Sequence, residues 1–428
     1  MSDRAEQTNR NVWKKRVLIL MSVALLARIA AAVLIEQYVQ NADRSFLVEG
    51  DANGYWILAQ QIVSGKDYSI YTPPRRVLRM PGFPILLATS IKLFGDSVLA
   101  ARIVLALVGT ACCWLTYCLG NRLYSPQTGF WAAMFVAVNP LHIGGSVLIL
   151  SETWFTFWML VSLLGLHWLL ASNRSTVAVD CVAGPCTWRL WLRSLLVGAL
   201  IGITVLVRPG FLPWLAICCL ANAVLLQRTV VVRALVCGGL FLGCMTMLLP
   251  WAARNATVTG HWVLTSLWSG PSLYDGLNPH ATGASDMRFF DEENVLSHMT
   301  EFEMNEHYKS RAMEFARNNP GRAGGLAVRK LGMVLTAVPN FAERKGWAVS
   351  AVCVATWLFL VITCAMGLQS RQWTAVNLLI MLGPLLQFLL VHMVFVGSVR
   401  YRLPLEFPLA VLGAIGWQKL VQRRQNSV

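Results

Sequence analysis

Charged side chains are scarce in this chain. They make up 13% of its 428 residues, whereas hydrophobic side chains make up 56%. A soluble domain usually has about a quarter of its residues charged, so the shortage excludes a soluble globular protein. The sequence predicts an all-α polytopic membrane protein, and its length allows about ten transmembrane helices with outer-face juxtamembrane helices beside them.

Acidic residues are scarcer still, with 21 Asp and Glu against 36 Lys and Arg and a net charge of +15. In a polytopic protein such an excess is typical of the cytoplasmic loops. The basic residues form no basic-aromatic motif for nucleic acid. We therefore expect membrane lipids as partners and no nucleic acid.

Internal repeats, low-complexity tracts and a disulfide pattern are also missing. Of the eleven cysteines, only Cys181 and Cys186 lie outside apolar runs, in a loop expected on the cytoplasmic side, so no disulfide framework is expected. The first apolar run has span length and no small-residue cleavage site, so we expect it to remain as a helix. Repeat-built transporters would show related halves and charges near the midplane of the bilayer; a polytopic transporter stays an alternative from another class.

Long apolar segments predict the transmembrane helices. They are 16–36, 97–119, 128–138, 152–171, 191–207, 210–226, 233–249, 347–368, 374–397 and 403–420. The segment 81–94 is short and predicts an interfacial or re-entrant helix. The expected modules are 1–250 with an outer loop at 37–94, an outer region at 251–346 with amphipathic helices at 299–318 and 322–338, and C-terminal helices at 347–428.

Lysine and arginine near the span ends set the expected orientation. They place both termini in the cytoplasm and the two large polar regions on the outer side of the cytoplasmic (inner) membrane. Only Asp3, Glu6 and Asp180 among the acidic residues then fall inside. Acidic residues do not determine topology, so this asymmetry indicates an outward-facing polar site.

Asp51 is the first candidate for chemistry. It lies in Gly50-Asp51-Ala52-Asn53-Gly54-Tyr55, just past the first predicted span. The flanking glycines allow a sharp turn and the close approach of a substrate. Two interpretations are open: Asp51 is the N-cap of an interfacial helix, or it is a general base at the membrane surface.

Glu152 is the second candidate acid, at the start of the predicted span 152–171. The helix dipole favours a carboxylate there, so Glu152 could serve the helix alone. An ionisable group at a span end is equally a candidate for function. Because Asp51 and Glu152 are expected at one membrane level, they could converge on one cavity.

Several arginines are expected at outer span ends, against the usual inside bias. Snorkelling explains isolated cases, but so many at one level indicate an anionic ligand, and a planar guanidinium suits phosphate. The candidates are Arg79, Arg102, Arg208, Arg254, Arg400 and Arg402.

These groups fit a transfer reaction with an anionic leaving group. Glycoside hydrolysis needs a second carboxyl group, because the leaving alcohol must be protonated. A lipid phosphate leaves as an anion, so one base and several arginines are enough. Attack opposite the phosphate would invert the anomeric carbon.

The chain resembles the GT-C superfamily of lipid-phosphosugar-dependent glycosyltransferases, in the branch of the aminoarabinose transferases and protein O-mannosyltransferases. The resemblance covers most of the chain and rests on the order and placement of short motifs. They are Gly50-Asp51 through Tyr55 with Ala59 and Gly65, Arg79-Met80-Pro81-Gly82-Phe83-Pro84, Leu93-Phe94-Gly95, Ala100-Ala101-Arg102, Asn139-Pro140, Ser151-Glu152, Arg208-Pro209, Pro250-Trp251 with Arg254-Asn255, Asn319-Pro320-Gly321 to Lys330, and Arg400-Tyr401-Arg402.

The resemblance implies an inverting transferase of a hexosyl or pentosyl group from a polyprenyl-phosphate donor. The acceptor would be a lipid, glycan or protein hydroxyl, and the active site would face the periplasm. It implies Asp51 as the catalytic base and Tyr55 as its matching tyrosine, with Glu152 at a second acidic position.

The resemblance also makes Arg254, Lys330 and Arg402 candidates for donor phosphate contacts. Relatives often carry adjacent acids in the first loop, whereas Gly50 and Ala52 flank Asp51 here. A divalent metal held by Asp51 and Glu152 therefore stays open, and no other cofactor is implied. An envelope-glycan polymerase or ligase is the nearer alternative function.

Overall fold

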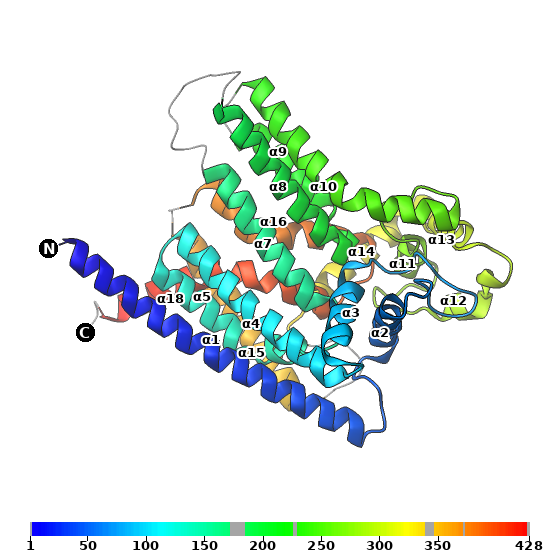
Figure 1. Cartoon of the computed structure of the whole chain (residues 1–428), viewed down its shortest axis with the longest axis horizontal. Helices are drawn as coiled ribbons and strands as arrows, with labels where there is room; N and C mark the ends of the chain where they lie inside the picture. The colour runs from blue at the N-terminus through cyan, green and yellow to red at the C-terminus, as the bar shows by residue number, and fades with distance from the viewer. Residues whose placement is uncertain (1, 172–184, 226–228, 339–345, 371–372, 426–428) are drawn as a thin grey trace.

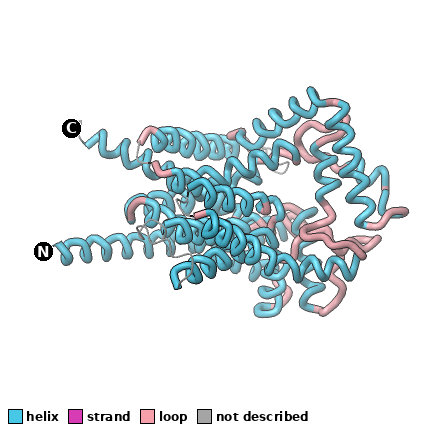
Figure 2. Tube along the Cα trace, turned by 90° about the horizontal axis from the view of Figure 1, so that it is seen from above, coloured by secondary structure: helices cyan, strands magenta, loops and turns pink. Residues whose placement is uncertain are grey.

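The structure is a computed structural model that describes residues 2–171, 185–225, 229–338, 346–370 and 373–425. Within these residues every named element is a helix, as the composition predicts. Long helices lie side by side, and most of the loops gather at the end opposite both termini (Figure 1, Figure 2). Cys181 and the side chain of Cys186 lie outside the described part of the chain.

Seven helices in the described residues are long and apolar enough to cross a membrane, so the chain is a multi-pass membrane protein. They are α1 (Ser2–Asn41), α4 (Val98–Leu123), α7 (Glu152–Ala171), α8 (Pro185–Val207), α10 (Val230–Thr259), α15 (Trp347–Leu368) and α16 (Ala375–Val394). The predicted span 152–171 coincides with α7, where an uninterrupted apolar run made both ends plain.

The predicted total of ten spans is not confirmed. The segments 128–138 and 210–226 form α5 (Pro126–Val138) and α9 (Pro213–Leu225), each 13 residues long, which is too short to cross a bilayer alone. The segment 403–420 becomes α18 (Glu406–Gln425), whose last turns are polar.

Helix α10 ends later than the predicted boundary at residue 249. It continues through Pro250 to Thr259 and stops at Gly260, which has a left-handed backbone with φ of 75°. Glycine adopts that conformation without steric cost and ends many helices in this way. The helix therefore crosses residue 250, where the sequence placed a module boundary.

Helix α5 ends inside the bundle because Pro140 soon follows and opens α6 (Pro140–Gly145). The last carbonyl groups of a helix have no intrahelical donors, and a bilayer supplies none. Arg28 of α1 is fully buried and donates to the carbonyl oxygens of Val136 and Ala137, each at 3.4 Å. A buried arginine thus supplies donors to a helix end within the apolar core.

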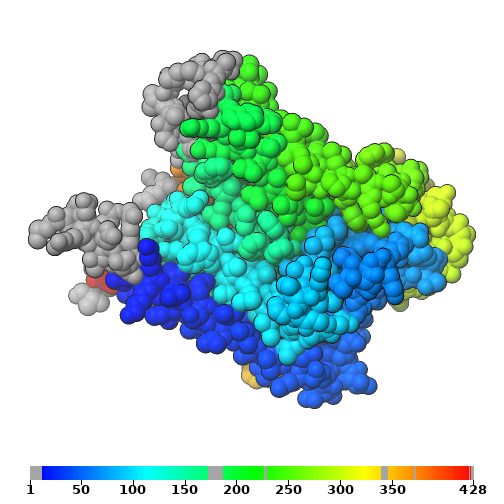
Figure 3. Space-filling model, viewed as in Figure 1, coloured from blue at the N-terminus to red at the C-terminus, as the bar shows by residue number. Residues whose placement is uncertain are grey.

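Several shorter helices lie at the loop-rich end of the molecule (Figure 1). They are α2 (Glu49–Val63), α3 (Gly82–Phe94), α11 (Ser269–Gly276), α12 (Arg288–Glu293), α13 (Glu301–Asn318), α14 (Pro320–Leu335) and α17 (Val399–Arg402). Helices form at the predicted segments 81–94, 299–318 and 322–338 as α3, α13 and α14, although α14 already ends at Leu335. Their placement at the outer membrane face stays a prediction. The two polar regions of the sequence lie side by side at this end (Figure 3).

Hydrogen bonds join these two polar regions. The Glu301 carboxylate, at the start of α13, accepts from the backbone N–H groups of Arg76 and Val77 at 2.9 and 3.0 Å. Arg254 of α10 donates to the carbonyl oxygens of Arg76 and Tyr68 at 2.7 and 3.1 Å. The segment that leads to Arg79 is thereby fixed from two sides.

Candidate active site

Asp51 lies in the first turn of α2, not at its N-cap. The helix begins at Glu49, with Val48 as the N-cap and no side-chain cap, so the N-cap prediction is wrong. Both oxygens of the Asp51 carboxylate instead bind arginines: Oδ1 accepts from Arg79 Nη2 at 3.0 Å and Oδ2 from Arg400 Nη2 at 2.6 Å. A residue two positions inside the helix is free to point its carboxylate away from the helix end.

Arg79 reaches Asp51 across the ring of Tyr55. Its guanidinium carbon lies 4.4 Å from the ring centroid, and the Tyr55 hydroxyl lies 3.3 Å from Ser151 Oγ. Gly54 makes this approach feasible, because a Cβ atom there would lie 2.9 Å from Arg79 Nε. Gly54 therefore leaves room for the Arg79 side chain, and Tyr55 packs against its guanidinium group.

Glu152 begins α7 and binds Arg400 as well as a third arginine. Its Oε1 accepts from Arg208 Nη2 at 3.3 Å and from Arg400 Nε in a short contact. Arg400 of α17 therefore bridges Glu152 and Asp51. We call Asp51, Arg79, Glu152, Arg208 and Arg400 the ion-pair cluster; its members come from five separate segments of the chain.

The ion-pair cluster holds three guanidinium groups and two carboxylates, so it carries one positive charge in excess. Burial by itself would raise the pKa of Asp51, but Arg400 and Arg79 outweigh it and hold that pKa well below its usual range. Burial likewise opposes the charge of Arg400, yet Glu152 and Asp51 keep its pKa well above the usual value.

The cluster is reachable and incompletely paired. The Asp51 side chain is 34% exposed and that of Arg400 is 23% exposed. Within the described residues, Glu152 Oε2 and Arg208 Nη1 are buried without a hydrogen-bond partner. Buried polar atoms usually have partners, so these two atoms mark a place where a polar ligand would complete the network.

The other predicted cations form their hydrogen bonds with groups outside the cluster. Arg102 donates to Glu36 and to the carbonyl oxygen of Val147, and Arg254 donates to the carbonyl oxygens of Arg76 and Tyr68. Lys330 donates to the carbonyl oxygens of Met393 and Val394. Arg402 donates to Glu406 and to the carbonyl oxygens of Val334 and Thr336. Burial lowers the pKa of Lys330 to about 8, against the opposing effect of Asp275. Their predicted contacts with a donor phosphate stay predictions.

Tyr401 and His392 lie beside the cluster, and neither was among the site residues predicted from the sequence. The Tyr401 ring stacks on His392 at 4.4 Å, and the Arg208 guanidinium carbon lies 5.5 Å from the Tyr401 ring centroid. The position of Tyr401 between Arg400 and Arg402 was the available signal.

A divalent metal does not fit this cluster. Asp51 and Glu152 are bound to three guanidinium groups, which repel a cation. Throughout the described residues, no group of three or more His, Cys, Asp or Glu side chains could hold a metal ion. We therefore derive no chemical step from a metal.

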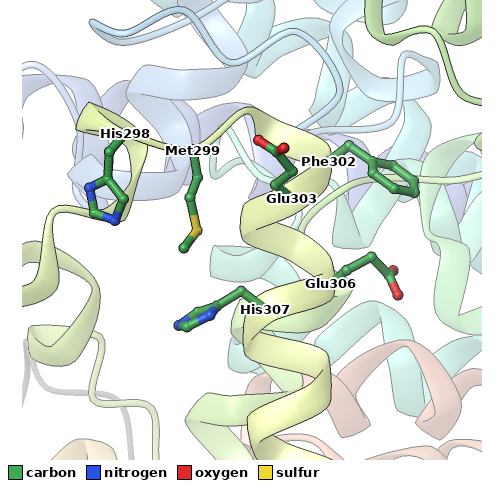
Figure 4. A pocket seen from close by; sticks show the side chains of 6 residues that line it. All are labelled: His298, Met299, Phe302, Glu303, Glu306 and His307. Carbon is green, nitrogen blue, oxygen red and sulfur yellow. The ribbon is translucent and has the colours of Figure 1, made fainter.

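A separate open depression of about 410 Å³ lies beside α13. Figure 4 shows His298, Met299 and His307 facing a common opening beside α13. Its lining residues include no member of the ion-pair cluster, and Glu303 there is already engaged with Thr300 in the capping box of α13. We assign it no chemical role.

The sequence matches no family model and no curated protein. The fold does match solved structures. The oligosaccharyltransferase of Archaeoglobus fulgidus in the apo form gives a TM-score of 0.57 at 15% identity, covering 96% of this chain and 52% of that one. A second structure is the oligosaccharyltransferase AglB of the same organism, in complex with an inhibitory peptide and a dolichol-phosphate. It gives a TM-score of 0.50 at 14% identity and covers 96% of this chain and 52% of that one.

A weaker match is ArnT from Cupriavidus metallidurans bound to undecaprenyl phosphate, with a TM-score of 0.44 at 12% identity, covering 95% of this chain and 78% of that one. The chain spans about half the length of the archaeal oligosaccharyltransferase. At such low sequence identities, the matches show that the folds are similar. The chain therefore shares its polytopic membrane fold with the archaeal oligosaccharyltransferase.

Proposed function

We propose that the protein is a membrane glycosyltransferase. It moves a sugar from a polyprenyl-phosphate donor to an acceptor hydroxyl at the outer face of the cytoplasmic membrane, with inversion and with Asp51 as general base. One observation carries the proposal: five distant segments bring two carboxylates and three guanidinium groups together at the loop-rich end of a GT-C-like fold. The excess positive charge and the unpaired Arg208 Nη1 suit a phosphate.

The proposed reaction needs one proton transfer by the protein. The acceptor oxygen forms a bond to the anomeric carbon while the bond from that carbon to the phosphate oxygen breaks. The bonding electrons leave with the polyprenyl phosphate, which departs as an anion, and the acceptor proton passes to Asp51. Arg400, Arg79 and Arg208 stabilise the phosphate charge that develops.

In the cluster, each oxygen of Asp51 accepts a hydrogen bond from an arginine. A donor phosphate offers these arginines a second anion, and a guanidinium that turns to the phosphate releases one Asp51 oxygen. The pKa of Asp51 then rises, because its neutralising partner has moved. The base would become competent only when the donor is bound.

This exchange gives an expected pH dependence. The low pKa of Asp51 keeps the carboxylate ionised in the free protein, so kcat/KM for the donor should show no acid limb from Asp51 above about pH 4. In the donor complex the pKa is higher, so kcat should begin to fall at a higher pH than kcat/KM does. Profiles of both constants over about pH 4 to 8 test this; an acid limb of kcat/KM at or above that of kcat would contradict the exchange.

The outer location of the site is tested by labelling single cysteines. Ser310 on α13 and Gln422 near the end of α18 are both exposed, at opposite ends of the molecule. With a membrane-impermeant maleimide, Ser310→Cys should react in intact cells, whereas Gln422→Cys should react only after permeabilisation. The unsubstituted protein gives the background, and the reverse pattern would overturn the orientation.

The function itself is tested by mass analysis of envelope glycolipids and glycoproteins with and without the gene. We expect one envelope component to lose a sugar substituent when the gene is deleted and to regain it with the wild-type gene. An unchanged set of envelope sugars would count against a transferase. The component that changes would identify the acceptor as a lipid, a glycan or a protein.

A further inference from the structure

Glu406, the first residue of α18, joins two buried side chains beside the ion-pair cluster. Its Oε1 accepts from Arg402 Nε at 2.8 Å, and its Oε2 lies 3.1 Å from His142 Nε2 in a hydrogen bond. The side chains of Glu406, Arg402 and His142 are 4%, 1% and 3% exposed. Both carboxylate oxygens are therefore committed inside the protein.

The two partners of Glu406 belong to the segments that carry cluster residues. Arg402 ends the four-residue helix α17, which also contains Arg400. His142 lies in α6, in the broken stretch that runs from the end of α5 to Glu152. One carboxylate thus connects the segment of Arg400 with the segment that leads to Glu152.

Arg402 extends this connection to α14. Its Nη1 donates to the carbonyl oxygens of Val334 and Thr336 at 2.9 and 2.6 Å, at the end of α14 where carbonyl groups lack intrahelical donors. Its guanidinium carbon lies 3.6 Å from the Trp357 ring centroid. Arg402 is therefore fixed on several sides, and Glu406 provides the charge opposite it.

Helix α17 needs such support because it is too short to hold its own position. The charged contacts of the Arg400 side chain are with Asp51 and Glu152, and these are the contacts that a bound phosphate would exchange. While the exchange takes place, the backbone of α17 must be held by groups outside the cluster. The Arg402–Glu406 pair meets that requirement because its hydrogen bonds go to His142, Val334 and Thr336, which are not cluster members.

We propose that Glu406 is a positioning residue that keeps the Arg400 segment and the Glu152 segment in a fixed relation. The inference rests on the proposed function only for its effect on phosphate binding. Removing the whole Glu406 side chain would leave Arg402 without a charge partner and without a hydrogen-bond acceptor, which is strongly destabilising. The test therefore uses the isosteric Glu406→Gln, which removes the charge and keeps an acceptor. Its amide oxygen can still accept from Arg402, whereas the connection to His142 is weakened.

The first measurement is amide hydrogen exchange of the purified full-length protein. Glu406→Gln should speed exchange by about tenfold in peptides covering residues 139–151 and 395–405, and leave α13 unchanged. The matched control is Glu36→Gln, which alters the ion pair between Glu36 and Arg102. This control should leave the rate of hydrogen exchange in residues 395–405 unchanged. Unaltered exchange in both peptides of Glu406→Gln would overturn the inference, whatever the protein's function.

The second measurement is a double-mutant cycle on the affinity for farnesyl phosphate, a short prenyl phosphate. Glu406→Gln alone should weaken binding about tenfold, but it should change binding less than about twofold when Arg400 is already alanine. That loss of effect means that Glu406 acts through Arg400, which a general loss of stability would not produce. Full additivity of the two substitutions would contradict the positioning role.

The two measurements test the positioning role of Glu406 separately from the proposed function. If the wild-type protein does not bind farnesyl phosphate, the proposed function fails, and the exchange data alone decide the role of Glu406. If Glu406→Ala does not purify as a folded protein, Glu406→Gln still carries both measurements. If both variants fold, Glu406→Ala should speed hydrogen exchange and weaken farnesyl phosphate binding more than Glu406→Gln does.

Discussion

Asp51→Asn should lower the rate of sugar transfer by about 10²- to 10⁴-fold, the usual contribution of a general base. Asparagine keeps the size of the side chain but cannot take the acceptor proton. It also withdraws the negative charge that holds Arg79 and Arg400, so the affinity for a polyprenyl phosphate should stay the same or increase. A large fall in kcat with unchanged or tighter lipid binding distinguishes a lost base from a damaged site.

The matched control is Asp96→Asn, which changes an exposed carboxylate that binds Gln60 Nε2. It makes the same chemical change on the same side of the predicted membrane. Its transfer rate should stay within about twofold of wild type, as is usual for surface positions. Equal rates for Asp51→Asn and wild type would remove Asp51 from the reaction.

Arg400→Ala should lower kcat/KM for the donor by about 10²- to 10³-fold, the scale seen when one donor that stabilises a transition-state anion is removed. Arg400 is the residue that contacts both Asp51 and Glu152, so its loss also leaves these carboxylates less neutralised. Arg400→Lys should restore little of the lost kcat/KM, because a single ammonium group cannot donate in the two fixed directions in which a guanidinium donates.

The control for this variant is Arg288→Ala, at an arginine whose side chain is 81% exposed and pairs with Asp286. Its kinetics should match wild type. The measurement is steady-state kinetics with the donor varied at a fixed acceptor concentration. If Arg400→Ala left both KM and kcat for the donor unchanged, the phosphate role of Arg400 would be lost.

The sequence predicted the membrane architecture where hydropathy alone decides it. The run 152–171 was delimited correctly because it is uninterrupted and opens on an acid. The shorter helices α5 and α9 were counted as spans because an apolar run of about 13 residues has the same composition as a true span. The end of α10 was missed because Pro250 reads as a stop, whereas Gly260 provides the actual one.

The sequence identified every member of the ion-pair cluster as a candidate, but it could not say which candidates meet. Arg400 and Arg402 are two residues apart, yet Arg400 reaches Asp51 and Arg402 is buried against Glu406. Their spacing gives no sign of this difference, because it depends on which side of a four-residue helix faces the site. Residues 51 and 400 meet only through the tertiary fold.

Glu406 was not singled out, although the sequence held a signal for it. An acid in an otherwise apolar predicted span, four residues after an arginine, is the spacing of a helical ion pair, and charges in such segments are seldom incidental. Only Asp51 and Glu152 were considered as acids for chemistry, so Glu406, which binds Arg402 and His142, was not considered.

The most direct test of the central claim is transfer by the purified protein in liposomes, with a radiolabelled sugar on polyprenyl phosphate and a membrane extract as acceptor. We predict that the wild-type protein moves the label from the lipid to an acceptor and that Asp51→Asn leaves it on the lipid. Label that stays on the lipid with the wild-type protein, or equal transfer by the two proteins, would contradict the assignment.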